Sequence, residues 1–547
     1  MKTICIFLAV FIVSLSPYIA HSQEFDKQDT LRGSITKERV WWDLTHYELS
    51  VEVLPETKSL TGSNKVSFKV LKEDSILQID LQSGMSISKI MYQGEELSFE
   101  KNGNAHFIHF PTKLAKDSIH SIIINFGGTP KISARPPWDG GLTWAKDDNN
   151  NPFIATAVQG EGASIWWPCK DHMYDEPDSM KMHITVPSGL MDVSNGRLLK
   201  IDSLDNDRVS FTWNVVNPIN NYGVNINVGD YVHFGEKYQG LKGTLDCDYY
   251  VLSYNEDSAR KQFSQVPLML EAFEYWFGPY PFYEDGFKLV EAPYLGMEHQ
   301  SSVTYGNGFK NGYFGRDLSR TGWGKKFDFI IIHESGHEWF ANNITYKDIA
   351  DMWIHESFTA YSESLYLDFH FGKEAGQEYV RGTRANIRND RPIIGYYNVN
   401  HSGSGDMYYK GSNMLNTIRS IIHDDELWRS ILVGLNETFY HKTVTTKEIE
   451  NYIIEHSKYD LQSTFDQYLR TTEIPELSYY LDEDRLFYRW TNCLPNFNMP
   501  AEISSEASTL YIFPTTEWNY IEINPSEREW KLDENYFAGF KLYRGKK

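Results

Sequence analysis

The sequence predicts a multidomain α+β protein, with an N-terminal antiparallel β domain, a mainly helical domain and a short C-terminal β domain. Three patterns support this prediction. Short runs of alternating apolar residues fill the first part of the chain, helical spacing dominates the middle, and short strand-like runs return after Arg470. A chain of 547 residues allows several domains of about 100 to 200 residues each. We place the domain boundaries where the pattern changes, which gives domains at residues 23–253, 254–470 and 471–547.

In the two β domains, strands are predicted where apolar residues recur at every second position. Apolar residues alternate along residues 47–53 and again along residues 66–70, with turn residues such as Pro55 between the runs. Alternation interrupted by turns is typical of antiparallel sheets. In the C-terminal domain the corresponding runs are residues 486–490, 510–513 and 520–523.

The helical domain begins with residues 263–277, whose apolar residues recur at helical spacing until Gly278 and Pro279 end the pattern. Pro267 lies inside this stretch, so we expect a kink or a break into two shorter helices. Further helices are predicted at residues 327–343, 354–371 and 407–422.

The N-terminal residues 1–22 form a separate pattern. Lys2 is followed by an apolar run from Ile4 to Leu15 and then by the small residues Ala20 and Ser22. The run of about 12 residues is too short for a membrane span, which needs about 20. We therefore predict a cleaved signal peptide and an exported protein, periplasmic or extracellular, with no membrane span after its removal.

Charge and cysteine content exclude several classes of protein. The chain has 74 acidic and 52 basic residues, whereas nucleic-acid binding requires Lys and Arg clustered on one face, so we expect no nucleic-acid partner. Once Cys5 leaves with the signal peptide, Cys169, Cys247 and Cys493 remain, widely separated. Three such thiols form neither a disulfide framework nor a multi-cysteine zinc site.

The strongest chemical signal is an H-E-x-x-H motif formed by His333, Glu334 and His337 within a helical pattern. Four residues on a helix turn through about 400° and rise about 6 Å, so both imidazoles lie on one face and can bind one Zn²⁺. Glu334 is poorly placed as a ligand and well placed as a general base acting on water. The alternative is a helix whose two histidines merely face the core.

Glu356 is the candidate third ligand. Eighteen residues separate it from His337, enough for a turn and a second helix that packs against the first. Two histidines, one glutamate and an open fourth position are typical of a catalytic zinc site, with one Zn²⁺ per chain. His355 is a weaker candidate because one helical step turns it about 100° away, and we expect it to be a partly exposed polar residue.

These motifs, with the segment from Trp353 to Tyr361 around Glu356, resemble the zinc aminopeptidases of the aminopeptidase N and leukotriene-hydrolase type, which are gluzincin metallopeptidases. The resemblance covers most of the mature chain. It implies that the helical domain is a thermolysin-like catalytic domain. It also implies a hydrolase that releases the N-terminal residue from peptides with a free N-terminus.

Three further segments carry the resemblance and its site residues. Gly296, Met297 and Glu298 match the family's G-[AG]-M-E-N segment, which pairs with the substrate backbone and whose glutamate holds the substrate α-ammonium. This segment departs from the pattern at Leu295 and His299, where relatives have Gly and Asn.

Gln159, upstream, matches a family position that we expect to be a second contact to the substrate amine. Tyr408, in Tyr408-Tyr409-Lys410-Gly411, matches the tyrosine that donates a hydrogen bond to the oxyanion. Glu363 fits a recurring family position but reads equally well as a solvated acid.

The sequence therefore predicts a zinc-dependent aminopeptidase in which Glu334 is the general base and Tyr408 stabilises the oxyanion. A zinc endopeptidase on the same fold is an alternative that Glu298 argues against. A catalytically inactive peptide-binding protein would lack a ligand, the base or the tyrosine, and all of these are present. Nothing in the sequence favours lipid epoxide hydrolysis, an activity of one branch of the family.

Overall fold

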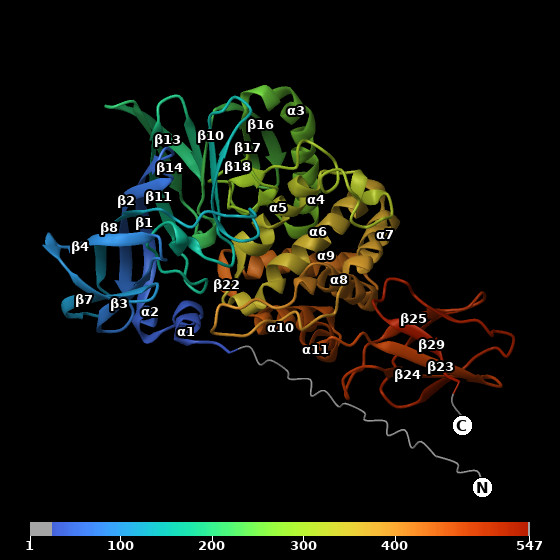
Figure 1. The fold of residues 1–547 in the computed structure, drawn as a ribbon. Helices are drawn as coiled ribbons and strands as arrows, with labels where there is room; N and C mark the ends of the chain where they lie inside the picture. The colour runs from blue at the N-terminus through green and yellow to red at the C-terminus, as the bar shows by residue number, and fades with distance from the viewer. Residues whose placement is uncertain (1–23, 545–547) are drawn as a thin grey trace, which may run out of the picture.

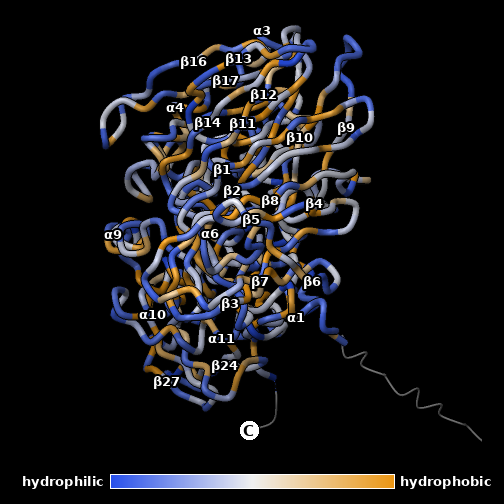
Figure 2. The backbone as a smooth tube through the Cα atoms, turned by 90° about the vertical axis from the view of Figure 1, so that its left-hand side faces the viewer, coloured by the Kyte–Doolittle hydropathy of each residue, from blue (hydrophilic) through white to orange (hydrophobic). Residues whose placement is uncertain are grey.

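The computed structural model describes residues 24–544. The predicted signal peptide, residues 1–22, lies outside them. A β-rich part, a helical part and a group of short C-terminal strands follow one another along the chain, which confirms the predicted fold class (Figure 1). None of the described helices combines the length and the apolar character that crossing a membrane requires. Hydrophobic stretches (orange) and hydrophilic stretches (blue) alternate at short intervals along the backbone in Figure 2.

An eight-stranded sheet forms the centre of the N-terminal part. Along its β1 strand Tyr47, Leu49 and Val51 are buried in alternation, as a two-residue period requires. One pair departs from the predicted antiparallel arrangement, because β1 and β11 run parallel, joined by a connection of more than a hundred residues. In sheet order the strands are β13 (Arg197–Leu204), β14 (Arg208–Val215), β11 (Ser179–Pro187), β1 (Trp42–Leu54), β2 (Ser59–Val70), β8 (Ile119–Gly128), β4 (Met85–Tyr92) and β5 (Glu95–Glu96).

Two smaller sheets and two short helices complete this part. The apolar side chains of the three sheets join in one buried cluster, which includes Trp41, Trp42, Trp166, Trp167 and Trp213. One small sheet is β12 (Met191–Ser194), β15 (Ile226–Gly229), β10 (Pro152–Ala157) and β9 (Gly141–Lys146); the other is β3 (Asp74–Asp80), β7 (Ala105–Leu114) and β6 (Ser98–Asn102). The helices that precede β1 are α1 (Lys27–Gly33) and α2 (Lys37–Val40).

The helical part contains a five-stranded sheet. Its order is β16 (Tyr231–Gly240), β17 (Gly243–Leu252), β18 (Phe287–Glu291), β20 (Val303–Tyr305) and β19 (Gly296–Met297). Because β17 pairs with β18, this sheet begins before the boundary predicted at residue 254. The short strand β19 lies at the sheet edge, antiparallel to β20.

Most of the predicted helices are present. The break expected near Pro267 is confirmed, because a 3₁₀ turn separates α3 from α4 and Pro267 lies in the first turn of α4, where it loses no hydrogen bond. The continuous helix predicted at residues 327–343 is wrong in its second half. There α5 ends at Gly336 and a π-helical turn follows, in which Phe340 and Ala341 leave helical backbone angles.

The remaining elements of this part are numerous. The helices are α3 (Glu256–Gln262), α4 (Val266–Phe277), α5 (Phe329–Gly336), α6 (Trp353–Phe371), α7 (Lys373–Thr383), α8 (Tyr409–Ile422), α9 (Asp425–Thr438), α10 (Thr446–Ser457) and α11 (Gln462–Arg470). A parallel two-stranded sheet joins β21 (Ile344–Tyr346) to β22 (Lys442–Val444).

The C-terminal strands form two small sheets that pack on the helical part, at the lower right of Figure 1. Their apolar side chains continue the buried cluster of the helical part. Hydroxyl groups of Tyr511 and Tyr536 donate to the backbone carbonyls of Ile421 and Ser420 in α8. The strands are β27 (Asn519–Glu522), β24 (Arg485–Thr491), β23 (Glu476–Asp482) and β29 (Gly539–Leu542), and β26 (Thr509–Ile512), β25 (Ala501–Ser504) and β28 (Lys531–Leu532).

Candidate metal centre

Helix α5 positions two histidines toward α6. The helix begins at Phe329 because the Asp328 carboxylate accepts hydrogen bonds from two otherwise free backbone N–H groups, at 3.1 and 3.4 Å. Its apolar residues 330–332 are fully buried and fix its orientation. His333 and His337 lie one turn apart, with ring centroids 5.0 Å from each other.

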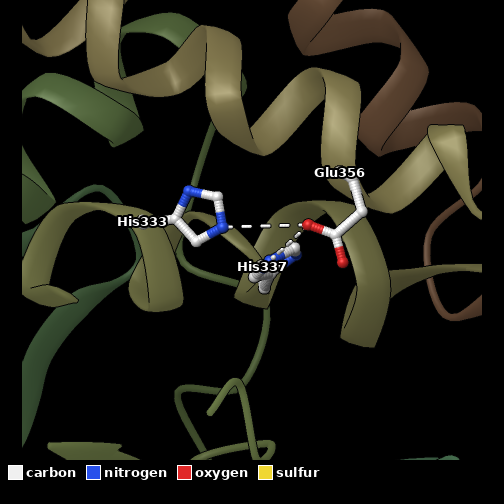
Figure 3. Close-up of side chains that lie close together, drawn as sticks. All are labelled: His333, His337 and Glu356. Atoms are coloured by element: carbon white, nitrogen blue, oxygen red, sulfur yellow. Dashed lines mark ion pairs between the residues drawn. The ribbon is translucent and has the colours of Figure 1, made fainter. Parts of the chain in front are cut away.

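Glu356, in the first turn of α6, meets both imidazoles (Figure 3). Its Oε2 atom lies 3.7 Å from Nε2 of His333 and 3.5 Å from Nε2 of His337. Two ligand atoms that each bind one zinc ion at about 2 Å are separated by about 3 to 4 Å. The three side chains are buried, and Glu356 Oε2 has no hydrogen-bond partner among the described residues. This donor set therefore fits Zn²⁺.

Hydrogen bonds behind the histidines fix which nitrogen each one presents. His333 Nδ1 lies 2.7 Å from Oε1 of Glu363, and His337 Nδ1 lies 3.0 Å both from the carbonyl of Phe340 and from the hydroxyl of Thr359. With Nδ1 engaged, Nε2 of each ring is left to bind a metal. Glu363 is 1% exposed, which excludes the solvated-acid alternative.

Glu334, the predicted general base, follows His333 on α5 and lines the cleft in front of the three candidate ligands. It is 8% exposed and buried against the strand β19. A Cβ at Gly296 would approach the Glu334 Cγ atom to 3.1 Å and the Ile330 Cγ2 atom to 2.7 Å. Gly296 therefore allows β19 to lie directly against the base.

Glu298 follows β19 and lies at the end of the cleft next to His337. Its Oε1 atom accepts hydrogen bonds from Gln159 Nε2 (2.6 Å) and from the Tyr222 hydroxyl (3.1 Å). Gln159 Nε2 also lies 3.2 Å from Oε1 of Glu356. Both of these hydrogen bonds to the Glu298 carboxylate use Oε1, which leaves Oε2 for another donor. Gln159, from the N-terminal part, thus joins Glu298 and the candidate metal ligands.

The electrostatics of this group favour bound cations. Burial, reinforced by the charge of Glu298, raises the pKa of Glu334 to about 7, and burial, reinforced by Glu356, raises the pKa of Glu298. Burial opposes ionisation of Glu356, but His337 and His333 lower its pKa below the usual range. Mutual repulsion between these buried carboxylates contributes to the raised pKa values of Glu334 and Glu298, and a bound cation would relieve it.

Tyr408 lies immediately before α8, and its ring stacks over His333 with centroids 6.0 Å apart. Burial, together with the charges of Glu356 and Glu298, raises the pKa of Tyr408 well above the usual value. The hydroxyl therefore keeps its proton and can donate a hydrogen bond. Lys410 has a different task, since its ammonium donates to the backbone carbonyl of Thr471 and anchors α8.

All nine predicted site residues line one cleft. Met297 contributes to its wall and is 6% exposed. Of the two departures from the family segment, Leu295 lines the cleft, whereas His299 is fully buried behind it, with Nδ1 3.4 Å from the hydroxyl of Thr304. Other wall residues are Trp138, Tyr313, Phe329, Ile330, Met352 and Tyr409.

One sequence prediction about this region is wrong. His355 was expected to be partly exposed, but it is fully buried, because β21 covers its face of α6. Its Nε2 accepts a hydrogen bond from the backbone N–H of Tyr346 (3.0 Å), and its ring stacks on that tyrosine at 4.1 Å. These contacts direct His355 away from the candidate metal ligands.

Two contributors were missed. Tyr222 supports Glu298 directly, and the Asn342 side chain donates to the backbone carbonyl of Glu298 (2.8 Å). Tyr222 is one of 35 tyrosines and belongs to no motif in the sequence. Asn342 lies five residues after His337, in the π-helical turn, and only the departure from helical geometry there brings it to Glu298.

Comparisons with known proteins identify a family of related sequences. The Peptidase M1 N-terminal domain matches residues 44–222, and the Peptidase family M1 domain matches residues 263–468. A probable aminopeptidase 1 from Sulfurisphaera tokodaii is 19% identical over 87% of this chain and 58% of its own length. Leukotriene A-4 hydrolase from Xenopus laevis is 22% identical over 76% of this chain and 69% of its own length. The first match thus spans little more than half of the relative.

Solved structures share the fold. An M1 zinc metallopeptidase from Deinococcus radiodurans superposes with a TM-score of 0.68 at 19% sequence identity, covering 81% of this chain and 96% of that one. A mutant of that metallopeptidase bound to a Tyr-Ser-Ala substrate superposes with a TM-score of 0.66, also at 19% identity, over 80% of this chain and 96% of that one.

Proposed function

Because the chain belongs to peptidase family M1, with both its N-terminal and its catalytic domain matched, we propose that it is a zinc-dependent aminopeptidase. The observation that carries this proposal is the contact between Gln159 and Glu298 beside the candidate metal ligands. This contact supports the proposal because it holds a buried carboxylate in the same cleft as the candidate metal ligands, where it could bind a substrate α-ammonium.

His333, His337 and Glu356 would hold one zinc ion per chain. When bound, zinc supplies a Lewis acid that polarises the scissile carbonyl and lowers the pKa of water. The chain's own residues supply the rest. Glu298 offers Oε2, and Gln159 offers its amide oxygen, to the three N–H groups of a substrate α-ammonium. An ammonium held there lets only the first peptide bond reach the ligands.

Glu334 and Tyr408 serve the reacting atoms. Glu334 takes the proton of the attacking water and passes it to the leaving amine. Tyr408 donates a hydrogen bond to the oxygen on which negative charge develops. Burial of the Glu334 side chain strengthens its electrostatic interactions, because the surroundings are less polar than water.

The proposal is tested with a panel of aminoacyl chromogenic amides and the same compounds with the α-amine acetylated. We expect the free amides to be cleaved and the acetylated ones to resist cleavage. Glu298→Ala should lower kcat/KM for the free amides by about 100-fold, the loss expected for a buried charged hydrogen bond. If acetylated and free substrates are cleaved equally, the protein is an endopeptidase.

We also propose that the protein is exported after removal of residues 1–22, on the strength of the pattern at its N-terminus. The N-terminal residue of the mature protein, determined by mass spectrometry after expression in a secreting bacterial host, tests this. A chain that retains Met1 in the soluble cell fraction would contradict export.

A further inference from the structure

The turn that carries Gln159 depends on contacts from other parts of the chain. Strand β10 ends at Ala157, and the turn closes through a backbone hydrogen bond from Gly162 to Val158 (2.7 Å). Gly160 and Gly162 have φ angles of +78° and +93°, which glycine adopts without strain. Such a turn has no sheet partner, so side chains from elsewhere must fix the position of Gln159.

Arg32, on α1, supplies the charged contact, and the Gln82 side chain also donates to the Glu161 carbonyl (2.6 Å). The Arg32 guanidinium lies 3.0 Å from the Asp171 carboxylate, donates to the Asp171 backbone carbonyl, and lies 3.3 Å from the backbone carbonyl of Glu161. The Asp171 carboxylate in turn accepts a hydrogen bond from the backbone N–H of Ser164 (3.0 Å). A Cβ at Gly162 would overlap both charged groups, so the turn lies directly on the Arg32–Asp171 pair.

This ion pair is well shielded from water. Only 18% of the Arg32 side chain and 6% of the Asp171 side chain are exposed. Shielded, hydrogen-bonded ion pairs are weakened little by salt, in contrast to exposed pairs. The pair can therefore hold the turn at both low and high salt concentration.

The other side of the turn is held from the helical part of the chain. The Asn400 side chain donates to the Gly160 carbonyl (3.1 Å). The loop that carries Asn400 also lies against the N-terminal segment, since the Phe25 ring packs edge-on to Tyr396 (5.4 Å) and His401 (5.6 Å). Residues 24–40 thus contact both the turn of Gln159 and the loop opposite it.

We propose that Arg32, paired with Asp171, is a positioning residue that holds the Gln159 turn against Glu298, so that the N-terminal segment 24–40 completes the site for the substrate amine. This inference rests on the proposed function, which assigns Gln159 and Glu298 to the amine. The segment precedes residue 44, where the match to the family's N-terminal domain begins. Because the Gln159–Glu298 hydrogen bond is 2.6 Å long, a displacement of the turn by about 1 Å would break it.

Arg32→Ala is the direct test, with steady-state kinetics on a free aminoacyl amide. We expect KM to rise about tenfold and kcat to stay within about twofold, because the reacting groups are untouched while amine binding is weakened. Arg32→Lys keeps the ion pair with Asp171 but not the fork that also reaches Glu161, so its KM should rise less. Gln28 lies on the same helix but donates a hydrogen bond to Asn102, so Gln28→Ala should have the KM and kcat of the wild type.

Hydrogen exchange provides a second measurement that does not depend on activity. In Arg32→Ala the backbone amides of residues 158–164 should exchange at least about tenfold faster than in the wild type, while those of β1 and β2 keep their rates. Unchanged KM and unchanged exchange in a folded Arg32→Ala protein would overturn the proposal. So would a rise in KM for Gln28→Ala equal to that for Arg32→Ala.

Failure of the proposed function gives a different result. In that case the wild-type protein would not distinguish free from acetylated substrates, whatever Arg32 does. The exchange experiment would still show whether Arg32 holds the turn. A wild-type preference for free amines that persists unchanged in Arg32→Ala would refute the positioning role alone.

Discussion

Glu363 offers the sharpest test of how this site is organised. Its carboxylate accepts from His333 Nδ1 (2.7 Å) and from the hydroxyl of Tyr379, and it is buried between α6 and α7. It makes no contact with the predicted substrate site, so its effect must pass through His333. Changing it should therefore alter zinc affinity rather than recognition of the substrate amine.

The size of the effect follows from the two hydrogen bonds. Glu363→Gln keeps an oxygen for His333 but removes the charge. A charged hydrogen bond contributes about 1.5 to 3 kcal/mol and a neutral one about 0.5 to 1.5, so the loss is about 1.4 kcal/mol, or tenfold in zinc affinity. Glu363→Ala leaves the His333 and Tyr379 donors unsatisfied in a buried place, which costs about 3 kcal/mol, or about 100-fold.

The assay is competition for zinc against a chromogenic chelator, with kcat measured at saturating zinc. Glu374→Gln is the matched control, because it removes the same charge from the exposed side of the neighbouring helix α7, where its side chain is 67% exposed. The reasoning fails if both Glu363 variants bind zinc within twofold of the wild type. It also fails if Glu374→Gln weakens zinc binding as much as Glu363→Gln does.

The other predictions concern catalysis, the metal and stability. Glu334→Gln should lower kcat by about 10² to 10⁴ with zinc affinity unchanged, and full activity in a zinc-loaded variant would exclude its role as base. Tyr408→Phe should lower kcat at least about 100-fold with little change in KM, whereas an effect confined to KM would place it in substrate binding instead. Dialysis against a chelator should abolish hydrolysis and added Zn²⁺ should restore it, so activity that survives complete zinc removal would contradict the zinc mechanism. Burial raises the pKa of Asp192, which accepts from Ser194 and Trp213, to about 8, so the folded protein retains a proton that the unfolded chain releases above about pH 4. The contribution of Asp192 to the free energy of unfolding should therefore fall as pH rises from about 4 to 8, and Asp192→Asn should melt higher than the wild type at pH 8; equal melting temperatures there would refute this.

Local patterns explain which parts of the site the sequence could predict. His333 and His337 are one helical turn apart, and that distance follows from their spacing alone. Glu356 required a further step, because its approach to the histidines depends on how α6 packs against α5. Glu298 and Gln159 could be selected only by resemblance, since each is an ordinary polar residue within its own segment.

The errors have physical causes as well. His355 was expected to be partly exposed because its helical phase points away from Glu356, and phase does not reveal which element covers that side. The helix predicted through residue 343 ends early, since tertiary contacts override the apolar period after Gly336. In both places the structure depends on a contact with another segment, which the local sequence pattern does not show.

The sequence by itself determined the order of β-rich and helical parts, the pair of histidines on one helix face, and the excess of acid that disfavours nucleic acid. These properties depend on short periods and on composition. The tertiary structure alone decided that Glu363 orients His333, that Tyr222 and Asn342 support Glu298, and that Arg32 fastens the turn of Gln159. Each of these contacts joins residues from 30 to more than 120 positions apart, or depends on a departure from regular helix. Such contacts form only when the chain folds into its tertiary structure, because the residues that make them are far apart in the sequence.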